Sequence, residues 1–169
     1  MEILRTERLR LREFTPADAD FVLGLLNEPG WLENINDPGV RSPQEALTWM
    51  EGRFFAPYRA QGHGFWAVER LEDGLLLGLC GLFRRPVLDG PDLGYALRRV
   101  HEGQGYALEA AQACVQHART ALRWPELLAI TKPGNVRSQG LLTKLGFVAE
   151  GERQLEGYDG PSSFWRMVL

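Results

Sequence analysis

The sequence predicts an α/β fold in which helices cover both faces of a mixed central sheet. Segments that alternate apolar and polar residues, as half-buried strands do, occur between segments with the apolar spacing of amphipathic helices. Turn signals and helix-start signals separate the two kinds of segment. The predicted order of elements is β-α-α-β-β-β-α-β-α-β-β. Since 169 residues suit one core and are too few for two, we predict a single domain over residues 1–169.

The first strand and the first two helices follow from short local patterns. Leucines alternate with arginines over residues 8–12, which indicates a strand with one buried face. Thr15 precedes a proline and is followed three residues later by an acid, which is a helix-start signal. An irregular run over residues 28–41 separates that helix from a second one. Its start at Ser42 has the form of a capping box with Glu45.

The second half of the chain begins with a predicted β-hairpin. Its strands, over residues 64–70 and 75–84, are joined by a short turn at 72–74. The last predicted elements, which follow the 92–107 stretch and its helix, are a strand at 127–131, a helix at 135–145 that ends before Gly146, and closing strands at 147–153 and 162–169.

Residues 92–107 organise the rest of the chain, because they join a strand to a long helix through a turn that contains Gly103 and Gly105. The first amides of a helix have no partner within it, and the helix dipole adds partial positive charge at that end. A phosphate-bearing ligand is therefore the natural occupant, and a tight turn that binds nothing is the alternative. The lysine of a P-loop and the third glycine of a dinucleotide-binding motif are both missing.

Composition and charge exclude several classes of function. The formal net charge of −3 argues against nucleic acid as the main partner. No stretch approaches the ~20 apolar residues of a membrane span, and no apolar run typical of a signal peptide follows Met1. We therefore expect a cytoplasmic protein without a membrane partner. Cys80 and Cys114 lie in apolar patterns, which indicates buried thiols rather than a disulfide, and no metal site is predicted.

Four motifs in a fixed order give the chain its likeness to a known family. They are Gly94-Tyr-Ala-Leu97, Gly103-Gln-Gly-Tyr-Ala107, Asn135-x-x-Ser138 and Lys144-Leu-Gly-Phe147. With the order of elements, they resemble the GNAT superfamily of acyl-CoA N-acyltransferases, nearest the branch that includes the ribosomal-protein alanine N-acetyltransferases. The likeness runs from about Thr6 to the C-terminus. It implies the GNAT-like form of the predicted sheet, with acetyl-CoA as the acetyl donor.

The resemblance implies a cofactor site between the strand and the helix of the 92–107 stretch. The family's acyl-CoA signature falls on residues 102–107, whose amides hold the CoA pyrophosphate in the family. Pantetheine enters between the strands at 92–98 and 127–131, and the amide of Leu97 polarises the thioester carbonyl, which is a catalytic role. Asn135 matches the family position that binds the pantetheine arm. The implied cofactor-binding residues are Ala96, Leu97, Arg98, Glu102, Gly103, Gln104, Gly105, Tyr106, Ala107, Asn135 and Ser138.

Two residues depart from the family pattern. Glu102 replaces the usual Gln or Arg and sets a carboxylate beside a phosphate site. Three basic residues could offset that charge: Arg98, Arg99 and Lys132. Leu142 stands where many members have a tyrosine that protonates the departing thiolate, and leucine cannot donate a proton. In the alanine N-acetyltransferase branch a matching serine is the proposed acid. Ser138 is therefore the candidate catalytic acid, and a serine that bonds only cofactor or backbone is the alternative.

The resemblance implies direct attack of an amine on the thioester, and positioning and oxyanion stabilisation supply most of the rate. The amine must first lose a proton. The candidate bases are Glu33, Asp37, Asp92 and Glu150.

The acceptor of the acetyl group is left open by the sequence. The family closes residues 28–41 over the acceptor, so Trp31 and Glu33 are predicted to bind it, together with Tyr95. A protein N-terminus and a small-molecule amine such as a polyamine both fit, and a homodimer is also open. A CoA-binding module without transferase activity is the alternative function.

Overall fold

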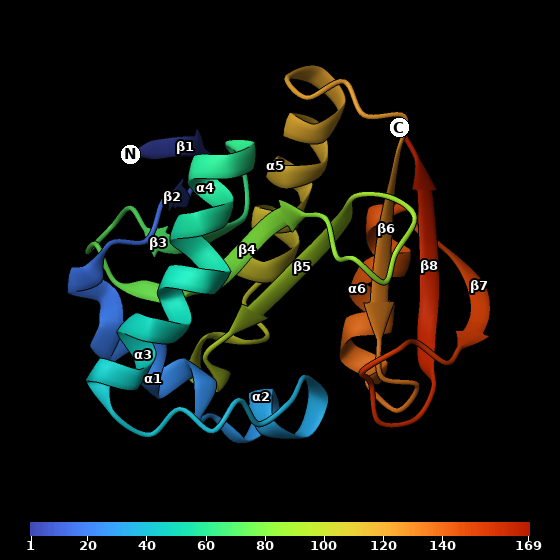
Figure 1. Cartoon of the computed structure of the whole chain (residues 1–169). Helices are drawn as coiled ribbons and strands as arrows, with labels where there is room; N and C mark the ends of the chain where they lie inside the picture. The colour runs from blue at the N-terminus through green and yellow to red at the C-terminus, as the bar shows by residue number, and fades with distance from the viewer.

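The chain folds around one eight-stranded sheet with helices on both faces (Figure 1). The computed structural model describes all of residues 1–169. Every neighbouring pair of strands is antiparallel except β5 and β6, which are parallel. In spatial order the strands are β1 (Glu2–Arg5), β2 (Leu9–Arg12), β3 (Phe65–Arg70), β4 (Leu76–Phe83), β5 (Asp92–Leu97), β6 (Glu126–Thr131), β8 (Ser162–Val168) and β7 (Val148–Arg153).

Six α-helices and three shorter helical turns connect these strands. The α-helices are α1 (Ala19–Leu26), α2 (Pro29–Asn34), α3 (Pro43–Met50), α4 (Ala56–Gln61), α5 (Tyr106–Thr120) and α6 (Val136–Leu145). The shorter turns are the 3₁₀ segments η1 (Pro16–Asp18) and η3 (Arg99–His101) and the π segment η2 (Glu51–Phe55). The predicted fold class, with its mixed sheet and helices on both faces, is confirmed.

The structure adds elements that the local sequence patterns do not predict. β1 pairs with β2 with a register shift between Glu2 and Leu4, and its adjacent apolar residues Ile3 and Leu4 lack the alternation that would have marked it as a strand. The irregular run after α1 contains α2, which begins at Pro29, the first helical position, where proline is tolerated. The helix that begins after Ser42 also continues through η2 into α4, as far as Gln61.

Two hydrophobic clusters lie on opposite faces of the sheet. Trp66 and Val68 of β3 belong to one cluster and Ala67 to the other, as the alternation of side chains along a strand requires. The first cluster packs the sheet against α5 and α6, and the second packs it against α1, α2, α3 and η2. Figure 1 shows α5 and α6 behind the strands and α1, α3 and α4 in front of them.

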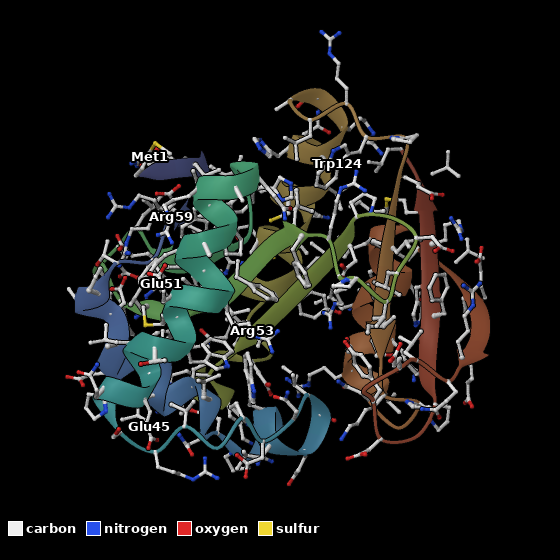
Figure 2. The ribbon with its side chains drawn as sticks, viewed as in Figure 1. Met1, Glu45, Glu51, Arg53, Arg59 and Trp124 are labelled. Carbon is white, nitrogen blue, oxygen red and sulfur yellow. The ribbon has the colours of Figure 1, made fainter.

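The helical run from α3 to α4 covers the front of the sheet. The hydroxyl of Ser42 accepts a hydrogen bond from the amide of Glu45 at 3.2 Å, as the capping pattern predicts. Glu51 and Arg59 form an ion pair on the outer surface of this run (Figure 2). At the far end of α5, Trp124 packs edge-on against His63, with ring centroids 5.0 Å apart. None of the helices is long and apolar enough to cross a membrane.

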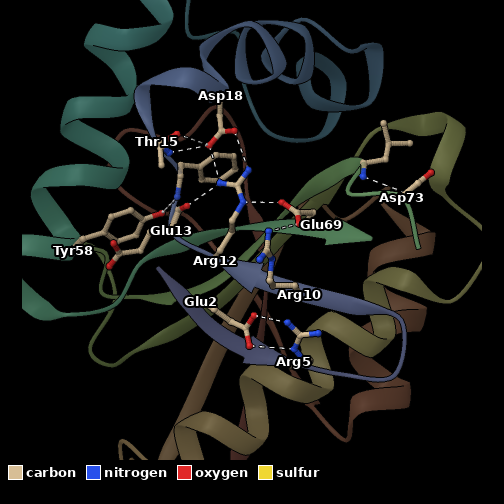
Figure 3. A network of polar contacts seen from close by, with 12 residues as sticks. Glu2, Arg5, Arg10, Arg12, Glu13, Thr15, Asp18, Tyr58, Glu69 and Asp73 are labelled. Carbon is tan, nitrogen blue, oxygen red and sulfur yellow. Dashed lines mark hydrogen bonds and ion pairs between the residues drawn. The ribbon is translucent and has the colours of Figure 1, made fainter. Parts of the chain in front are cut away.

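A network of buried ion pairs joins β2 to the start of α1 (Figure 3). The guanidinium of Arg12 donates to both carboxylate oxygens of Asp18, at 2.9 and 3.0 Å, and to Glu69 of β3 at 2.8 Å. Asp18 also accepts from the amide of Thr15 at 2.8 Å. Burial alone would raise the pKa of Asp18, but the hydrogen bonds from Arg12 and Thr15 outweigh it and hold the pKa below its ordinary value.

Because of this network, we expect the free energy of unfolding to decrease as the pH falls. The pKa of Asp18 is lower in the folded chain than in the unfolded one, so its carboxylate stabilises the fold above pH ~4 and that contribution is lost as the pH falls. Asp18→Asn should lower the free energy of unfolding at pH 7 by about 3 kcal/mol and flatten the acid dependence. Urea unfolding between pH 3 and 7 measures both. Asp20→Asn on the exposed side of α1 is the matched control. An Asp18→Asn curve parallel to that of the unsubstituted protein would contradict this account.

Candidate active site

The two parallel strands at the centre of the sheet separate soon after they meet. Asp92 and Leu128 are the single ladder pair of β5 and β6, and the amide of Leu128 donates to the carbonyl oxygen of Pro91 at 2.9 Å. Beyond that pair the strands diverge toward their carboxyl ends (Figure 1). We call the unpaired stretch between residues 93–97 and 129–131 the β5–β6 gap.

Backbone polar groups of both strands face this gap. The amide of Arg98 donates to the carbonyl oxygen of Leu77, the residue before Gly78 of β4, at 2.8 Å. Because bonded and non-bonded residues alternate in an antiparallel pair, Leu97 and Tyr95 direct their amides away from β4. The same alternation on β6, whose other partner is β8, directs the amide of Ile130 toward β5. A ligand along the gap therefore meets backbone donors and acceptors on both sides.

Six consecutive amides are free at the start of α5. The amides of residues 103–108 donate no hydrogen bond within the protein, and the first helical bond joins the amide of Glu109 to the carbonyl oxygen of Gly105 at 3.1 Å. Gly103 and Gly105 have φ angles of 77° and 82°, which favour glycine. With the positive end of the helix dipole beside them, these amides are the donors that a bound phosphate requires.

Arg8 holds this turn from the side of β2. Its guanidinium donates to the carbonyl oxygen of Gln104 at 3.0 Å and lies 4.4 Å from the centre of the Tyr106 ring. The same side chain pairs with Glu109 of α5 at 2.6 Å. Contacts within the protein therefore fix the turn, and a ligand need not order it.

The carboxylate of Glu102 is paired across the mouth of the gap. Its partner is Arg137 in the first turn of α6, at 3.1 Å. None of the three residues expected to offset this charge forms an ion pair with Glu102, because Arg98 pairs with Glu28 and Lys132 donates to the carbonyl oxygen of Glu33. Since the Arg137 side chain is 67% exposed and the Glu102 side chain 34%, solvent screens the pair, and it changes the local charge more than the stability.

The segment that contains α2 lies across the carboxyl ends of β5 and β6. Glu28 pairs with Arg98, which directly follows β5, at 2.8 Å. The carbonyl oxygen of Glu33 accepts from Lys132, which directly follows β6, at 2.6 Å. The side chain of Trp31 is buried in the front cluster, so it anchors this segment. Of the two residues of α2 predicted to bind the acceptor, Glu33 is the exposed one.

Ser138 and Tyr95, predicted to act on opposite substrates, contact each other. The phenol oxygen of Tyr95 lies 2.7 Å from the hydroxyl oxygen of Ser138 and donates to the carbonyl oxygen of Ser138 at 3.1 Å. Burial raises the pKa of Tyr95 to about 12. Asn135 accepts a hydrogen bond from the amide of Ser138 at 3.2 Å and so caps α6. The side-chain nitrogen Nδ2 of Asn135 makes no hydrogen bond within the protein, so it is free for a ligand.

Leu142 and the two cysteines are buried, as the sequence predicts for the two thiols. Leu142 is 1% exposed and belongs to the cluster behind the sheet, so a tyrosine at this position would have to enter the core. The thiols of Cys80 and Cys114 lie 3.6 Å apart, and burial raises the pKa of Cys114, so the thiol form is favoured over the nucleophilic thiolate. No three His, Cys, Asp or Glu side chains are grouped closely enough to hold a metal ion.

Several residues that lie around the gap were not assigned to the site from the sequence. Arg8, Glu28 and Arg137 reach it through contacts with residues 35 or more positions away. No local pattern marks such contacts. The one signal in the sequence was that each of these residues is charged and lies near a predicted turn. That signal does not show which residues they contact.

Parallel strands that part beside a turn of free amides offer backbone donors and acceptors to an extended, phosphate-bearing ligand. Residues 8–148 match the family described as Acetyltransferase (GNAT) domain. The chain therefore belongs to the GNAT family of acetyltransferases. It is 30% identical over 152 residues to the uncharacterised N-acetyltransferase p20 of Bacillus licheniformis, which covers 89% of this chain and 85% of that protein.

Solved structures show the same fold. An acetyltransferase from Agrobacterium tumefaciens str. C58 is 26% identical and aligns with a TM-score of 0.82, covering 98% of this chain and 94% of that one. The ribosomal alpha-N-protein acetyltransferase RimL, solved in complex with coenzyme A, aligns with a TM-score of 0.83 at 17% identity, covering 100% of this chain and 98% of that one.

We expect Gly105→Glu to weaken binding of CoA by well over tenfold, or ~1.4 kcal/mol, because it places a negative charge beside the free amides. Calorimetric titration with CoA measures this. Gly62→Glu is the matched control, since Gly62 has a similar φ of 74° at the end of α4 and open space around it. Equal affinities in the two variants would remove the phosphate site from this turn.

The pair between Glu102 and Arg137 should tune the affinity for CoA. Arg137→Ala leaves a carboxylate unpaired near the phosphate, so we expect about threefold weaker binding, and Glu102→Gln should bind CoA slightly more tightly. In the Glu102→Gln background the Arg137→Ala change should cost little. A loss of the same size in both backgrounds would mean that Arg137 contacts CoA directly.

Proposed function

We propose that this protein transfers the acetyl group of acetyl-CoA to a primary amine by direct attack, without a covalent enzyme intermediate. The observation that carries the proposal is the row of free amides at residues 103–108, directly beside the β5–β6 gap. Family membership supplies the reaction class, and the N-acetyltransferase p20 supports nitrogen as the acceptor atom. The RimL structure shows that a chain of this fold holds coenzyme A.

The cofactor in this proposal follows the backbone. Its pyrophosphate lies on the amides of residues 103–108, and its pantetheine arm lies in the gap and bonds to backbone groups of β5 and β6. The amide of Leu97 then donates to the thioester oxygen and stabilises the oxyanion that forms on attack. The free side-chain nitrogen Nδ2 of Asn135 donates to the pantetheine arm.

Glu33 is the base that the ion pairs favour. The other three candidates are neutralised by arginines: Asp37 by Arg41, Asp92 by Arg85 and Glu150 by Arg166. Asp92 is also wholly buried at the opposite end of β5. Glu33 makes no ion pair and lies on α2, across the open end of the gap, so its carboxylate is free to take a proton from an ammonium group, directly or through water.

The acceptor is either the N-terminus of a polypeptide or a small amine. Release of CoA thiol from acetyl-CoA, followed with a chromogenic disulfide, tests the proposal against peptides that begin with serine or alanine and against spermidine. Mass spectrometry of the product confirms that the amine carries the acetyl group. Tight CoA binding without thiol release for any of these amines would instead identify a CoA-binding module.

Ser138→Ala should lower kcat by about tenfold to a hundredfold and leave the affinity for CoA nearly unchanged, if Ser138 protonates the departing thiolate. This is at or below the low end of the effect of a general acid, which is about 10²–10⁴-fold, because water can substitute for the serine. Thr143→Ala removes a hydroxyl from the exposed side of the same helix and is the matched control. Wild-type turnover in Ser138→Ala, under conditions where chemistry limits the rate, would falsify the acid role.

A further inference from the structure

Tyr95 is the residue of β5 that reaches across to α6. Its phenol oxygen meets both the hydroxyl oxygen of Ser138, at 2.7 Å, and the carbonyl oxygen of Ser138, at 3.1 Å. The backbone of the serine is fixed separately, because its amide donates to the capping side chain of Asn135. Ser138 is therefore held at its backbone by α6 and at its hydroxyl by the sheet.

The single proton of the phenol decides what the serine proton can do. If Tyr95 donates to the hydroxyl oxygen of Ser138, the serine keeps its own proton available for another acceptor. If Tyr95 donates only to the carbonyl oxygen, the serine hydroxyl donates to the phenol and its proton is occupied. The 2.7 Å contact between the two hydroxyls can run in either direction, whereas the 3.1 Å contact with the carbonyl oxygen can only be a donation by the phenol, so both acceptors lie within reach of the one phenol proton.

We propose that Tyr95 is a positioning residue for the transfer reaction, and that with acetyl-CoA bound its phenol proton turns from the carbonyl oxygen to the hydroxyl oxygen of Ser138, so that the serine proton points into the β5–β6 gap. This inference rests on the proposed function. As the tetrahedral intermediate collapses, the carbon–sulfur bond breaks and its electron pair leaves on sulfur. The thiolate takes the proton of Ser138, and the serine oxygen regains the proton that the attacking nitrogen loses. One amine and one thioester become one amide and one thiol, and Tyr95 loses no proton.

The neutral state of the phenol suits this role. Burial raises the pKa of Tyr95 to about 12, so the side chain remains a donor throughout the physiological pH range. Its ring packs against the cluster behind the sheet. Tyr95→Phe therefore removes the hydroxyl and keeps the packing, which makes it a clean test of the hydrogen bond.

A double-mutant cycle separates a positioning role from a structural one. With acetyl-CoA saturating and the best amine of the peptide and spermidine panel as acceptor, Tyr95→Phe should lower kcat about tenfold and leave KM for acetyl-CoA nearly unchanged. In the Ser138→Ala background the same change should alter kcat by less than about twofold, because the group through which Tyr95 acts is gone. Tyr58→Phe, at another buried, hydrogen-bonded tyrosine, is the control for losing a phenol.

Each outcome decides the matter. Equal losses from Tyr95→Phe in both backgrounds, or wild-type kcat in Tyr95→Phe, would overturn the positioning role and leave the transferase intact. An unsubstituted protein that binds CoA but releases no thiol with any amine would overturn the proposed function, and this inference with it. Circular dichroism and thermal unfolding of each variant show that a loss of kcat is not a loss of fold.

Discussion

The parting of two parallel strands is the constraint on which the rest of the structure depends. Strands that separate leave backbone groups of Tyr95, Leu97 and Ile130 without ladder partners, and unpaired polar groups inside a protein are costly. The sheet tolerates this because each strand is held on its outer side. β5 makes six register pairs with β4, and β6 makes six with β8. The gap is therefore built into the sheet, and it favours a ligand with amide groups of its own.

Polar contacts bound the gap on several sides. Tyr95 and Ser138 join β5 to α6 behind the sheet, and Glu102 and Arg137 join the turn before α5 to the same helix. The segment that contains α2 is tied to residues that follow both strands. Each of these hydrogen bonds and ion pairs joins two elements that border the gap. The amine in the proposed reaction must therefore enter beside α2, where the exposed carboxylate is Glu33.

Patterns that depend on neighbouring residues were predictable from the sequence, and pairings between distant residues were not. The hairpin of β3 and β4, the cap at Ser42 and the glycine turn before α5 all follow from local chemistry. Helix α2 could not be predicted, because the only helical signal in this irregular run is the proline at its start. Tyr95 and Ser138 are 43 residues apart, so their contact depends on the register of the sheet and the placement of α6. The sequence marked both residues, but for separate roles.

The turn before α5 also explains how an acidic protein could hold a pyrophosphate. The turn contains no lysine. The arginines around it form ion pairs with Glu28, Glu102 and Glu109. The attraction in the proposed complex then comes from amide dipoles of fixed geometry rather than from net charge. Such donors discriminate by shape, because only a group that fits the curvature of the turn reaches all of them. The glycines at 103 and 105 are needed for that curvature, and a side chain at either position would strain it.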